Sequence, residues 1–434
     1  VRAAARSSGL PLHNGVLTVN LAPADVRKEG SSFDLPILLS LINTDASERI
    51  DYGGKCFAGE LSLTGEVKHI TAAQGIEVFP VRDVLSLYNH LTGGKQLAPV
   101  PFSEERLRAE AAARALDFAD IKGQDAAKTA LEIAAAGGHN VLMIGSPGSG
   151  KTMLARRLPS IMPPMTLDEA LETTKIHSVA GRIGAGSGLI GQRPFRSPHH
   201  LTSRVALIGG GSTPQPGEIS LAHNGVLFLD ELPEFGRTLI ETLRQPMEEG
   251  RVTVSRAKYT VEYPADFMLI AAMNPCPCGY YGHPSRECVC SQSAVYQYMN
   301  RISGPVLDRI DLHVHVSPLS FSELYGERPE ESSATIRLRV VAARATQQAR
   351  FAGLPIHCNA SMGSKQIRAF CPLPAESETM LRRAMERMHL SARAYDRIVK
   401  VARTIADLAG EARIAPAHIA EAIRYRSLDR ESAR

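Results

Sequence analysis

The sequence lacks any long apolar run, and no segment approaches the roughly 18 consecutive apolar residues that a membrane-spanning helix requires. The first residues, VRAAARSSGLPLHNG, include basic side chains but are not followed by a hydrophobic region, which argues against a secretory signal at this end. We therefore expect a cytoplasmic protein in a reducing compartment. The sequence also lacks a starting methionine, so we expect a fragment that begins inside a domain.

An excess of charge of one sign is also missing. The 49 Lys and Arg residues nearly balance the 45 Asp and Glu residues, and the formal charge of +4 is too small to indicate a nucleic-acid partner. A DNA-binding surface must therefore be local. An apolar content of 44% over 434 residues is typical of a globular protein with two or three domains, and we find neither internal repeats nor low-complexity tracts.

Apolar periodicity and composition divide the chain into four parts. Residues 1–95 combine an alternating, strand-like stretch with the buried-helix pattern SFDLPILLSLI, which predicts a small α+β domain. A polar linker at 96–116 precedes residues 117–318, where short apolar strands alternate with helical segments and Gly/Pro loops, as in an α/β fold. Residues 319–434 carry amphipathic helical patterns and predict an all-α region.

The strongest motif is VLMIGSPGSGKT, in which a four-residue apolar strand runs into a glycine-rich loop and then into the helical pattern MLARRL. Glycines allow backbone N–H groups to turn inward around phosphate groups, and the N-terminus of the following helix adds partial positive charge. Lys151 would reach the β- and γ-phosphates, and the Thr152 hydroxyl would bind Mg²⁺. The expected nucleotide-binding residues of this loop are Gly145, Ser146, Pro147, Gly148, Ser149, Gly150, Lys151 and Thr152.

Two further apolar strands end in polar residues. GVLFLDELPEF delivers Asp230 and Glu231 at the C-terminal end of a buried strand, where the ligands of such sheets bind. We predict that Asp230 positions Mg²⁺ and that Glu231 is the general base that activates the attacking water. FMLIAAMN ends in Asn274, whose side chain can hydrogen-bond the γ-phosphate or the water. Together the motifs predict ATP hydrolysis with Mg²⁺ as cofactor.

This pattern resembles the AAA+ ATPases, in which the residue at the position of Asn274 is called sensor 1. The resemblance extends to SGPVLDRIDL, where Arg309 would be an arginine finger that enters the ATP site of the neighbouring subunit. The segment SARAYDRIVKVA resembles the sensor 2 helix of these ATPases. This resemblance implies that Arg393 is the sensor 2 residue, which closes the C-terminal helical lid on the γ-phosphate. An arginine donated in trans implies a ring, in this family a homohexamer. DFADIKGQDAAKTAL resembles the adenine-side element, with Ile121, Gly123 and Gln124 near the base.

Two insertions narrow the resemblance. A Gly/Pro-rich loop, LTSRVALIGGGSTPQPGEISLAHNG, resembles the helix-2 insertion of magnesium-chelatase-type ATPases, and EEGRVTVSRAKYTVEYPADFMLI resembles a pre-sensor hairpin. Arg256 and Lys258 at the hairpin tip could grip a DNA phosphate backbone without reading sequence, and a solvated basic turn is the alternative. Taken with RPFRSPHH, MNPCPCGYYG and RISGPVLDRIDL, these segments resemble the ComM/YifB group of magnesium-chelatase-like ATPases over essentially the whole chain.

The resemblance implies an α/β fold with an AAA+ P-loop NTPase core and an all-α lid, preceded by an incomplete α+β domain of the Lon-protease (S5-like) type. In that domain VNLAPADVRKEGSSFDLPI places Ser32 at the position of the protease nucleophile. The resemblance puts the partner lysine at position 74, which is Gln74 here, and Lys68 is out of register. Without an amine to accept its proton, Ser32 is an ordinary hydroxyl, so we predict an inactive peptidase fold.

Four of the seven cysteines lie in MNPCPCGYYGHPSRECVC, directly after Asn274. In a reducing compartment clustered cysteines favour a metal over disulfides, and four thiolates suit tetrahedral zinc. The C-x-C pairs are tighter than the commoner C-x2-C spacing, His283 could replace one sulfur, and four free thiols remain the alternative. Either way we expect a structural loop beside Asn274. The candidate zinc ligands are Cys276, Cys278, Cys288 and Cys290.

The resemblance implies a hexameric DNA helicase that promotes branch migration during recombination or natural transformation, with single-stranded or branched DNA and recombination proteins as partners. One alternative is a chelatase-type motor that powers Mg²⁺ insertion into a porphyrin. The cysteine segment and the Lon-like domain argue against it, because the chelatase subunits lack both. The others are an ATP-dependent protease or protein remodeller and a loader that does not unwind DNA. His199 and His200 could contact DNA, relay nucleotide state or pack, and packing is the default.

Substituting Glu231→Gln should leave ATP binding intact and abolish turnover, because the amide keeps the shape of the side chain but cannot accept the proton of the attacking water. Equilibrium binding of a fluorescent ATP analogue and a phosphate-release assay on the same preparation measure the two steps. Unchanged turnover would refute the role assigned to Glu231.

Overall fold

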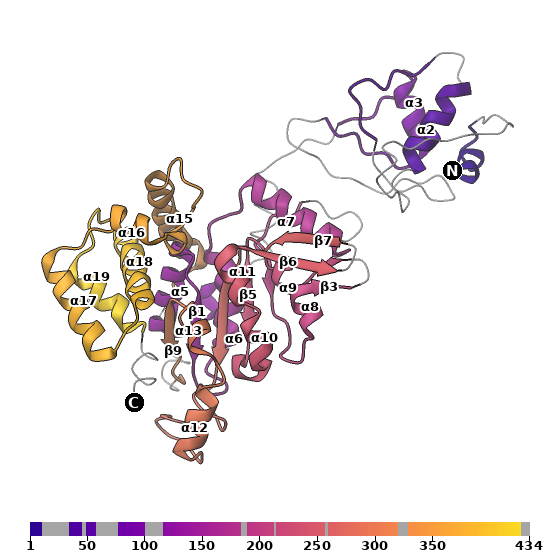
Figure 1. The fold of residues 1–434 in the computed structure, drawn as a ribbon. Coiled ribbons are helices and arrows are strands. Elements are labelled where there is room, and N and C mark those ends of the chain that lie inside the picture. The colour runs from indigo at the N-terminus through magenta and orange to yellow at the C-terminus, as the bar shows by residue number, and fades with distance from the viewer. Residues whose placement is uncertain are drawn as a thin grey trace. The chain divides into compact units, whose positions relative to one another are not determined.

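The computed structural model describes residues 1–10, 34–45, 49–57, 77–99, 116–183, 189–211, 214–256, 259–319 and 329–426. The chain divides into two compact units, the first formed by residues 1–107 with 181–190 and the second by 108–180 with 191–434 (Figure 1). Across the described ranges, no helix combines the length and the apolar character that a membrane crossing needs.

The described part of the first unit is helical. Its helices are α1 (Arg2–Ser7), α2 (Asp34–Asp45) and α3 (Val84–Leu91). Helix α2 confirms the helix expected from SFDLPILLSLI, and its Leu38 and Leu39 pack in one apolar cluster with Leu87 of α3. The strand-like stretch expected near the N-terminus and the positions of Ser32, Lys68 and Gln74 lie outside the described residues.

A five-stranded parallel sheet organises the second unit. Its strands are β1 (Val141–Ile144), β2 (Phe195–Arg196), β5 (Val226–Leu229), β8 (Met268–Met273) and β9 (Leu312–His315), in the order β2-β5-β8-β1-β9. The sequences of β1, β5 and β8 are continuously apolar because helices cover both faces of the sheet, and alternate residues enter opposite cores. Val141 and Met143 pack in one cluster, whereas Leu142 and Ile144 pack in the other.

The register of this sheet brings the predicted site residues to one edge. In β1, Ile144 pairs with Met273 of β8, and in β5, Leu229 pairs with Ala271 of the same strand. The phosphate loop, Asp230 and Asn274 each follow the last residue of a strand, so all three lie at the carboxyl edge of the sheet, where ligands of such sheets bind.

The remaining elements of the second unit include the two segments that the sequence analysis interpreted as insertions. The described residues of the expected Gly/Pro-rich loop form two short helices, Arg204–Ile208 and Glu218–Leu221, and between them the hairpin β3–β4, whose strands have two residues each. The expected pre-sensor segment forms the antiparallel hairpin β6–β7. Arg256 ends β6, and Lys258 at the tip lies outside the described residues. The core elements are η2 (Phe118–Asp120), α5 (Asp125–Gly137), α6 (Lys151–Ile161), α7 (Leu167–Val179), α8 (Arg204–Ile208), β3 (Gly209–Gly210), β4 (Gln215–Pro216), α9 (Glu218–Leu221), η3 (Leu232–Phe235), α10 (Arg237–Glu241), α11 (Arg244–Glu249), β6 (Arg251–Arg256), β7 (Tyr259–Pro264), α12 (Gln292–Met299) and α13 (Gly304–Leu307).

The expected all-α region follows β9. It consists of α15 (Ser333–Arg350), η4 (Asn359–Ser361), α16 (Ser364–Phe370), α17 (Ala375–Met388), α18 (Ala392–Leu408) and α19 (Pro416–Arg424). Helices α15 and α18 both pack on α5, beside the sheet, as Figure 1 shows. Helix α18 is amphipathic, with Ile398 and Val401 buried, and Gly410 follows it in the left-handed conformation that commonly terminates a helix.

A buried polar cluster connects this helical region to the sheet. Asp311, just before β9, accepts a hydrogen bond from Arg397 of α18 (2.6 Å) and one from the backbone N–H of Asn140 (3.1 Å). The His139 ring bridges Asp311 (3.3 Å) and the Thr404 hydroxyl (2.8 Å). Burial raises the pKa of Asp311, but Arg397 and His139 outweigh burial and hold the pKa of this carboxyl well below its usual range. The carboxylate is therefore charged at neutral pH.

Replacing Asp311→Asn should lower the free energy of unfolding by about 3 kcal/mol at pH 7, because the partly buried Arg397 loses its counter-charge. Since the folded pKa lies below the unfolded one, the contribution of Asp311 is present above about pH 4 and disappears as the pH falls further, so the variant and the parent should converge in acid. Urea unfolding at several pH values measures this. Asp308→Asn, beside a mostly exposed arginine, is the control, and an equal loss in both variants would contradict the prediction.

Candidate active site

The phosphate loop, residues 145–150, lies between the end of β1 and the start of α6. Gly148 and Gly150 have φ values of +78° and +93°, in the left-handed region that glycine adopts without steric cost. A Cβ at Gly145 would lie 2.3 Å from the carbonyl oxygen of Val316, so the loop packs directly against the chain that leaves β9. These glycines let the loop close over the N-terminus of α6, whose free N–H groups suit an anion.

Lys151 is held inside the phosphate loop. Its ammonium donates hydrogen bonds to the carbonyl oxygens of Gly145 (2.7 Å) and Ser146 (2.9 Å), and its side chain is largely buried. The Oδ1 atom of Asn274 lies 3.4 Å from the same nitrogen. Burial lowers the pKa of Lys151, and the nearby acidic groups oppose this shift. The structure thus brings together Lys151, at the start of α6, and Asn274, which follows β8, although they lie 123 positions apart in the sequence.

Thr152 contacts the acidic residue that follows β5. Its hydroxyl donates a hydrogen bond of 2.7 Å to Oδ2 of Asp230. A hydroxyl and a carboxylate at this separation are the oxygen ligands that Mg²⁺ takes in such sites, so the two residues fit the magnesium site expected from the sequence.

Glu231 has a partner that the sequence analysis did not assign. Its backbone is left-handed (φ +54°), and its Oε2 atom lies 3.2 Å from Nδ1 of His200. The centre of the His199 ring lies 4.1 Å from that of the His200 ring, with the two planes tilted by 35°. The pairing of β2 with β5 explains this contact. Because the two strands are parallel neighbours, the residues that follow β2 lie at the same edge of the sheet as Glu231, which follows β5.

Tyr298 of α12 is a further residue that the sequence analysis missed. It is largely buried, and its hydroxyl lies close to the backbone of Asn274. Burial raises the pKa of Tyr298 to about 12, with Glu234 adding to the shift, so the hydroxyl stays protonated at neutral pH. Helix α12 thereby supports the position of Asn274 from outside the sheet.

The adenine-side residues border the same loop. Gln124 donates hydrogen bonds to the carbonyl oxygens of Ser149 (3.2 Å) and Ser317 (2.7 Å), and the N–H of Gly123 donates to Glu330 (2.9 Å). A cavity of about 470 Å³ opens between these residues and the phosphate loop, with Ile121 and Gln124 in its lining. Its size is within the range of small-molecule sites.

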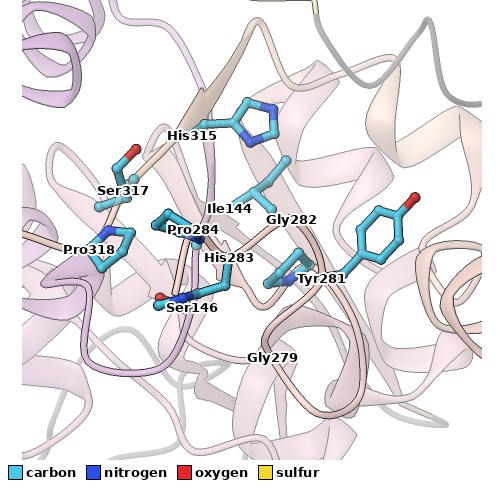
Figure 2. A pocket seen from close by; sticks show the side chains of 13 residues that line it. Ile144, Ser146, Gly279, Tyr281, Gly282, His283, Pro284, His315, Ser317 and Pro318 are labelled. Atoms are coloured by element: carbon cyan, nitrogen blue, oxygen red, sulfur yellow. The ribbon is translucent and has the colours of Figure 1, made fainter. Parts of the chain in front are cut away.

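A second cavity, of about 340 Å³, lies on the other flank of the phosphate loop. Figure 2 shows Ser146 of the loop, the Tyr281–Pro284 stretch and the segment Ser317–Pro318 around it. Residues 275–290, which we call the cysteine loop, therefore border both cavities that flank the phosphate loop.

The four clustered cysteines converge in space. Their sulfur atoms all lie within 4.8 Å of one another, and the Cys276 sulfur is 3.3 Å from that of Cys278 and 3.7 Å from that of Cys288. None of these cysteines forms a disulfide. Thiolates about 2.3 Å from a tetrahedral zinc ion lie about 3.8 Å apart, so the four residues, Cys290 included, fit such an ion. His283 is not in the cluster; its Nδ1 accepts the backbone N–H groups of two residues of its own turn.

Arg309 and Arg393 lie apart from the phosphate loop, and in the described part of the chain neither shares a hydrogen bond with it. The side chain of Arg309 is only 7% exposed and pairs with Glu248, whereas that of Arg393 is 68% exposed and lies 3.8 Å from Asp308. For Arg309 to act on a neighbouring subunit it would have to leave Glu248. One residue separates Arg309 from Asp311 in the sequence. The buried polar cluster around Asp311, which connects the helical region to the sheet, is therefore next to Arg309 along the chain.

Comparison with known proteins adds three family models and a set of relatives. Residues 117–324 match the model described as magnesium chelatase, subunit ChlI, residues 330–426 match that of its C-terminal region, and residues 1–79 match that of subunit ChlI of Mg-chelatase. The chain is 42% identical to uncharacterized protein YifB of Escherichia coli, over 99% of this chain and 88% of the relative. It is also 42% identical to competence protein ComM of Haemophilus influenzae, over 95% and 86%. A shorter match, 30% identical, covers 36% of this chain and 23% of the magnesium-chelatase 67 kDa subunit of Chlorobaculum parvum.

Substituting His200→Ala should lower the kcat of ATP hydrolysis by about tenfold with little change in KM, because Glu231 loses the imidazole nitrogen that lies 3.2 Å from its carboxylate and orients it. His200→Asn, which keeps a donor near the position of Nδ1, should recover part of the rate. His199→Ala is the matched control, since His199 contacts the ring of His200 but not Glu231. Steady-state kinetics decide, and equal losses in the His199 and His200 variants would contradict an orienting role.

Proposed function

Because the chain belongs to the ComM and YifB group of magnesium-chelatase-like AAA+ ATPases, we propose that it is a ring-forming motor that uses ATP to move DNA and promote branch migration. The observation that carries the proposal is the connection between the hairpin β6–β7 and the ATP site. Strand β7 leads through three residues into β8, and β8 ends beside Asn274. A change at the γ-phosphate can therefore be transmitted along one strand to the basic hairpin.

Each chemical role falls to a residue at the carboxyl edge of the sheet. Lys151 holds the β- and γ-phosphates, Thr152 and Asp230 hold Mg²⁺, and Glu231 accepts the proton of the attacking water. Bound Mg·ATP supplies the phosphoryl group and part of the charge neutralisation in the transition state. Asn274, which lies against the Lys151 ammonium, reports whether the γ-phosphate is present.

The ring follows from an arginine that acts between subunits. Arg309 comes from the segment before β9 and does not reach the phosphate loop of its own chain. In a homohexamer it would leave Glu248, enter the neighbouring site and stabilise the transition-state charge, while Arg393 closes the helical lid on the γ-phosphate. Hydrolysis then depends on contact between neighbours, which is what a processive motor on DNA requires.

The basic hairpin tip is the proposed DNA contact. Arg256 and Lys258 would face single-stranded or branched DNA in the pore and bind phosphates without reading bases. One relative is named a competence protein, which agrees with a role in recombination during natural transformation. We place the protein in the cytoplasm, with recombination proteins as partners, and assign zinc at the four cysteines a structural role. The Lon-like domain contributes no proteolysis in this account.

The proposal is tested by measuring ATPase rate and branch migration on forked and on linear DNA. Forked DNA should stimulate turnover, and Lys258→Ala should reduce both the stimulation and branch migration about tenfold while leaving the basal ATPase rate unchanged, because only phosphate binding at the pore is removed. Lys365→Ala, on the exposed start of α16, is the control.

Three results would contradict the proposal in different ways. Stimulation by a porphyrin-binding partner and not by DNA would favour a chelatase motor. Stimulation by DNA without strand displacement would favour a loader. Cleavage of casein that disappears in Ser32→Ala would show an active protease.

A further inference from the structure

The cysteine loop is in direct contact with the phosphate loop. Gly279, between Cys278 and Tyr280, has a φ of +85°, and a Cβ at this position would lie 2.5 Å from Cδ of Pro147. Only glycine allows this approach, since any side chain would displace the proline. The backbone that carries two of the four cysteines therefore rests on the middle of the phosphate loop.

The same loop supplies one wall of the adenine-side cavity. Tyr280, His283, Ser285 and Arg286 line it opposite Gly148–Gly150, together with Ile121 and Gln124. Arg286 donates a hydrogen bond of 2.7 Å to the hydroxyl of Tyr280, and its guanidinium carbon lies 5.1 Å from the centre of the Tyr280 ring. The wall thus places a cation and an aromatic ring beside the phosphate loop.

We propose that the cysteine loop is part of the nucleotide-binding site: a divalent metal ion at the four cysteines holds the loop against Pro147, and Arg286 and Tyr280 contact the bound adenine nucleotide. The inference rests on the ATP binding of the proposed function and deepens it. The sulfur positions fit one tetrahedral ion, and the Cys276 sulfur also accepts the N–H of Tyr281 at 3.3 Å, which ties the start of the wall to the cluster.

This arrangement makes nucleotide affinity depend on the metal. The cysteine loop has no helix or strand between Pro275 and Cys290, and its turns join only near neighbours, so the thiolates bring its two ends together. Without the ion, the turn at Gly279 would no longer be held against Pro147, and Tyr280 and Arg286 would no longer be fixed in the cavity wall. A purely structural metal site, remote from the nucleotide, would predict no such dependence.

The contact residues are tested first, by titrating a fluorescent ATP analogue with Mg²⁺ into the full-length protein. Arg286→Ala should weaken binding about tenfold, because a charged hydrogen bond is lost, and Tyr280→Ala should weaken it by a smaller factor. Zinc content, measured by mass spectrometry, should stay at one ion per chain in both variants. Arg387→Ala, on the exposed face of α17, is the control. Parental affinity in both the Arg286 and the Tyr280 variant would overturn the proposed contacts.

The metal is tested in the same titration. Cys278→Ser with Cys288→Ser should lose the ion and bind the nucleotide about tenfold more weakly, whereas Cys358→Ser, at a cysteine outside the cluster, should change neither. If the double variant does not fold, Gly279→Ala is the second test, because it keeps all four thiolates. It should retain zinc and weaken nucleotide binding, because the added methyl group would clash with Pro147. A parent protein without bound metal, or a metal-free or Gly279 variant with parental affinity, would overturn the coupling. None of these outcomes bears on DNA stimulation, so the proposed function and this inference can fail separately.

Discussion

The hydrogen bond between Thr152 and Asp230 is the contact on which the site depends. It joins the first turn of α6 to the end of β5, across the sheet edge where Lys151 and Asn274 also meet. This geometry exists only because β1, β5 and β8 are parallel neighbours, with their carboxyl ends in register. A parallel sheet buried on both faces requires apolar strands, and those strands made the motifs recognisable in the sequence.

The parts of the site that the sequence predicted are local. A glycine loop between a strand and a helix, and acidic residues after a buried strand, are read from a few consecutive residues, and the structure places Lys151, Thr152 and Asp230 together as expected. The contacts that the sequence did not predict join distant segments. His200 with Glu231, Glu248 with Arg309 and Gly279 with Pro147 depend on how the sheet and its loops pack, which no short pattern encodes.

In the cysteine loop, too, the sequence pattern predicted the local residues but not their contact with a distant segment. The spacing named the four candidate ligands and left zinc and free thiols open, and the structure brings the sulfur atoms within 4.8 Å of one another. What the spacing could not reveal is where the loop points. The structure shows that it contacts Pro147 and lines the cavity beside the phosphate loop.

The central claim, a nucleotide site completed by the neighbouring subunit, is tested most directly by mixing two inactive variants. Lys151→Ala lacks phosphate binding but keeps Arg309, and Arg309→Ala has the reverse defect. Each alone should show only background ATPase activity, and an equal mixture should recover about a quarter of the parental rate, because half of the subunits carry an intact phosphate loop and half of their neighbours carry the arginine. A mixture that stays at background, or full activity of Arg309→Ala alone, would contradict the account.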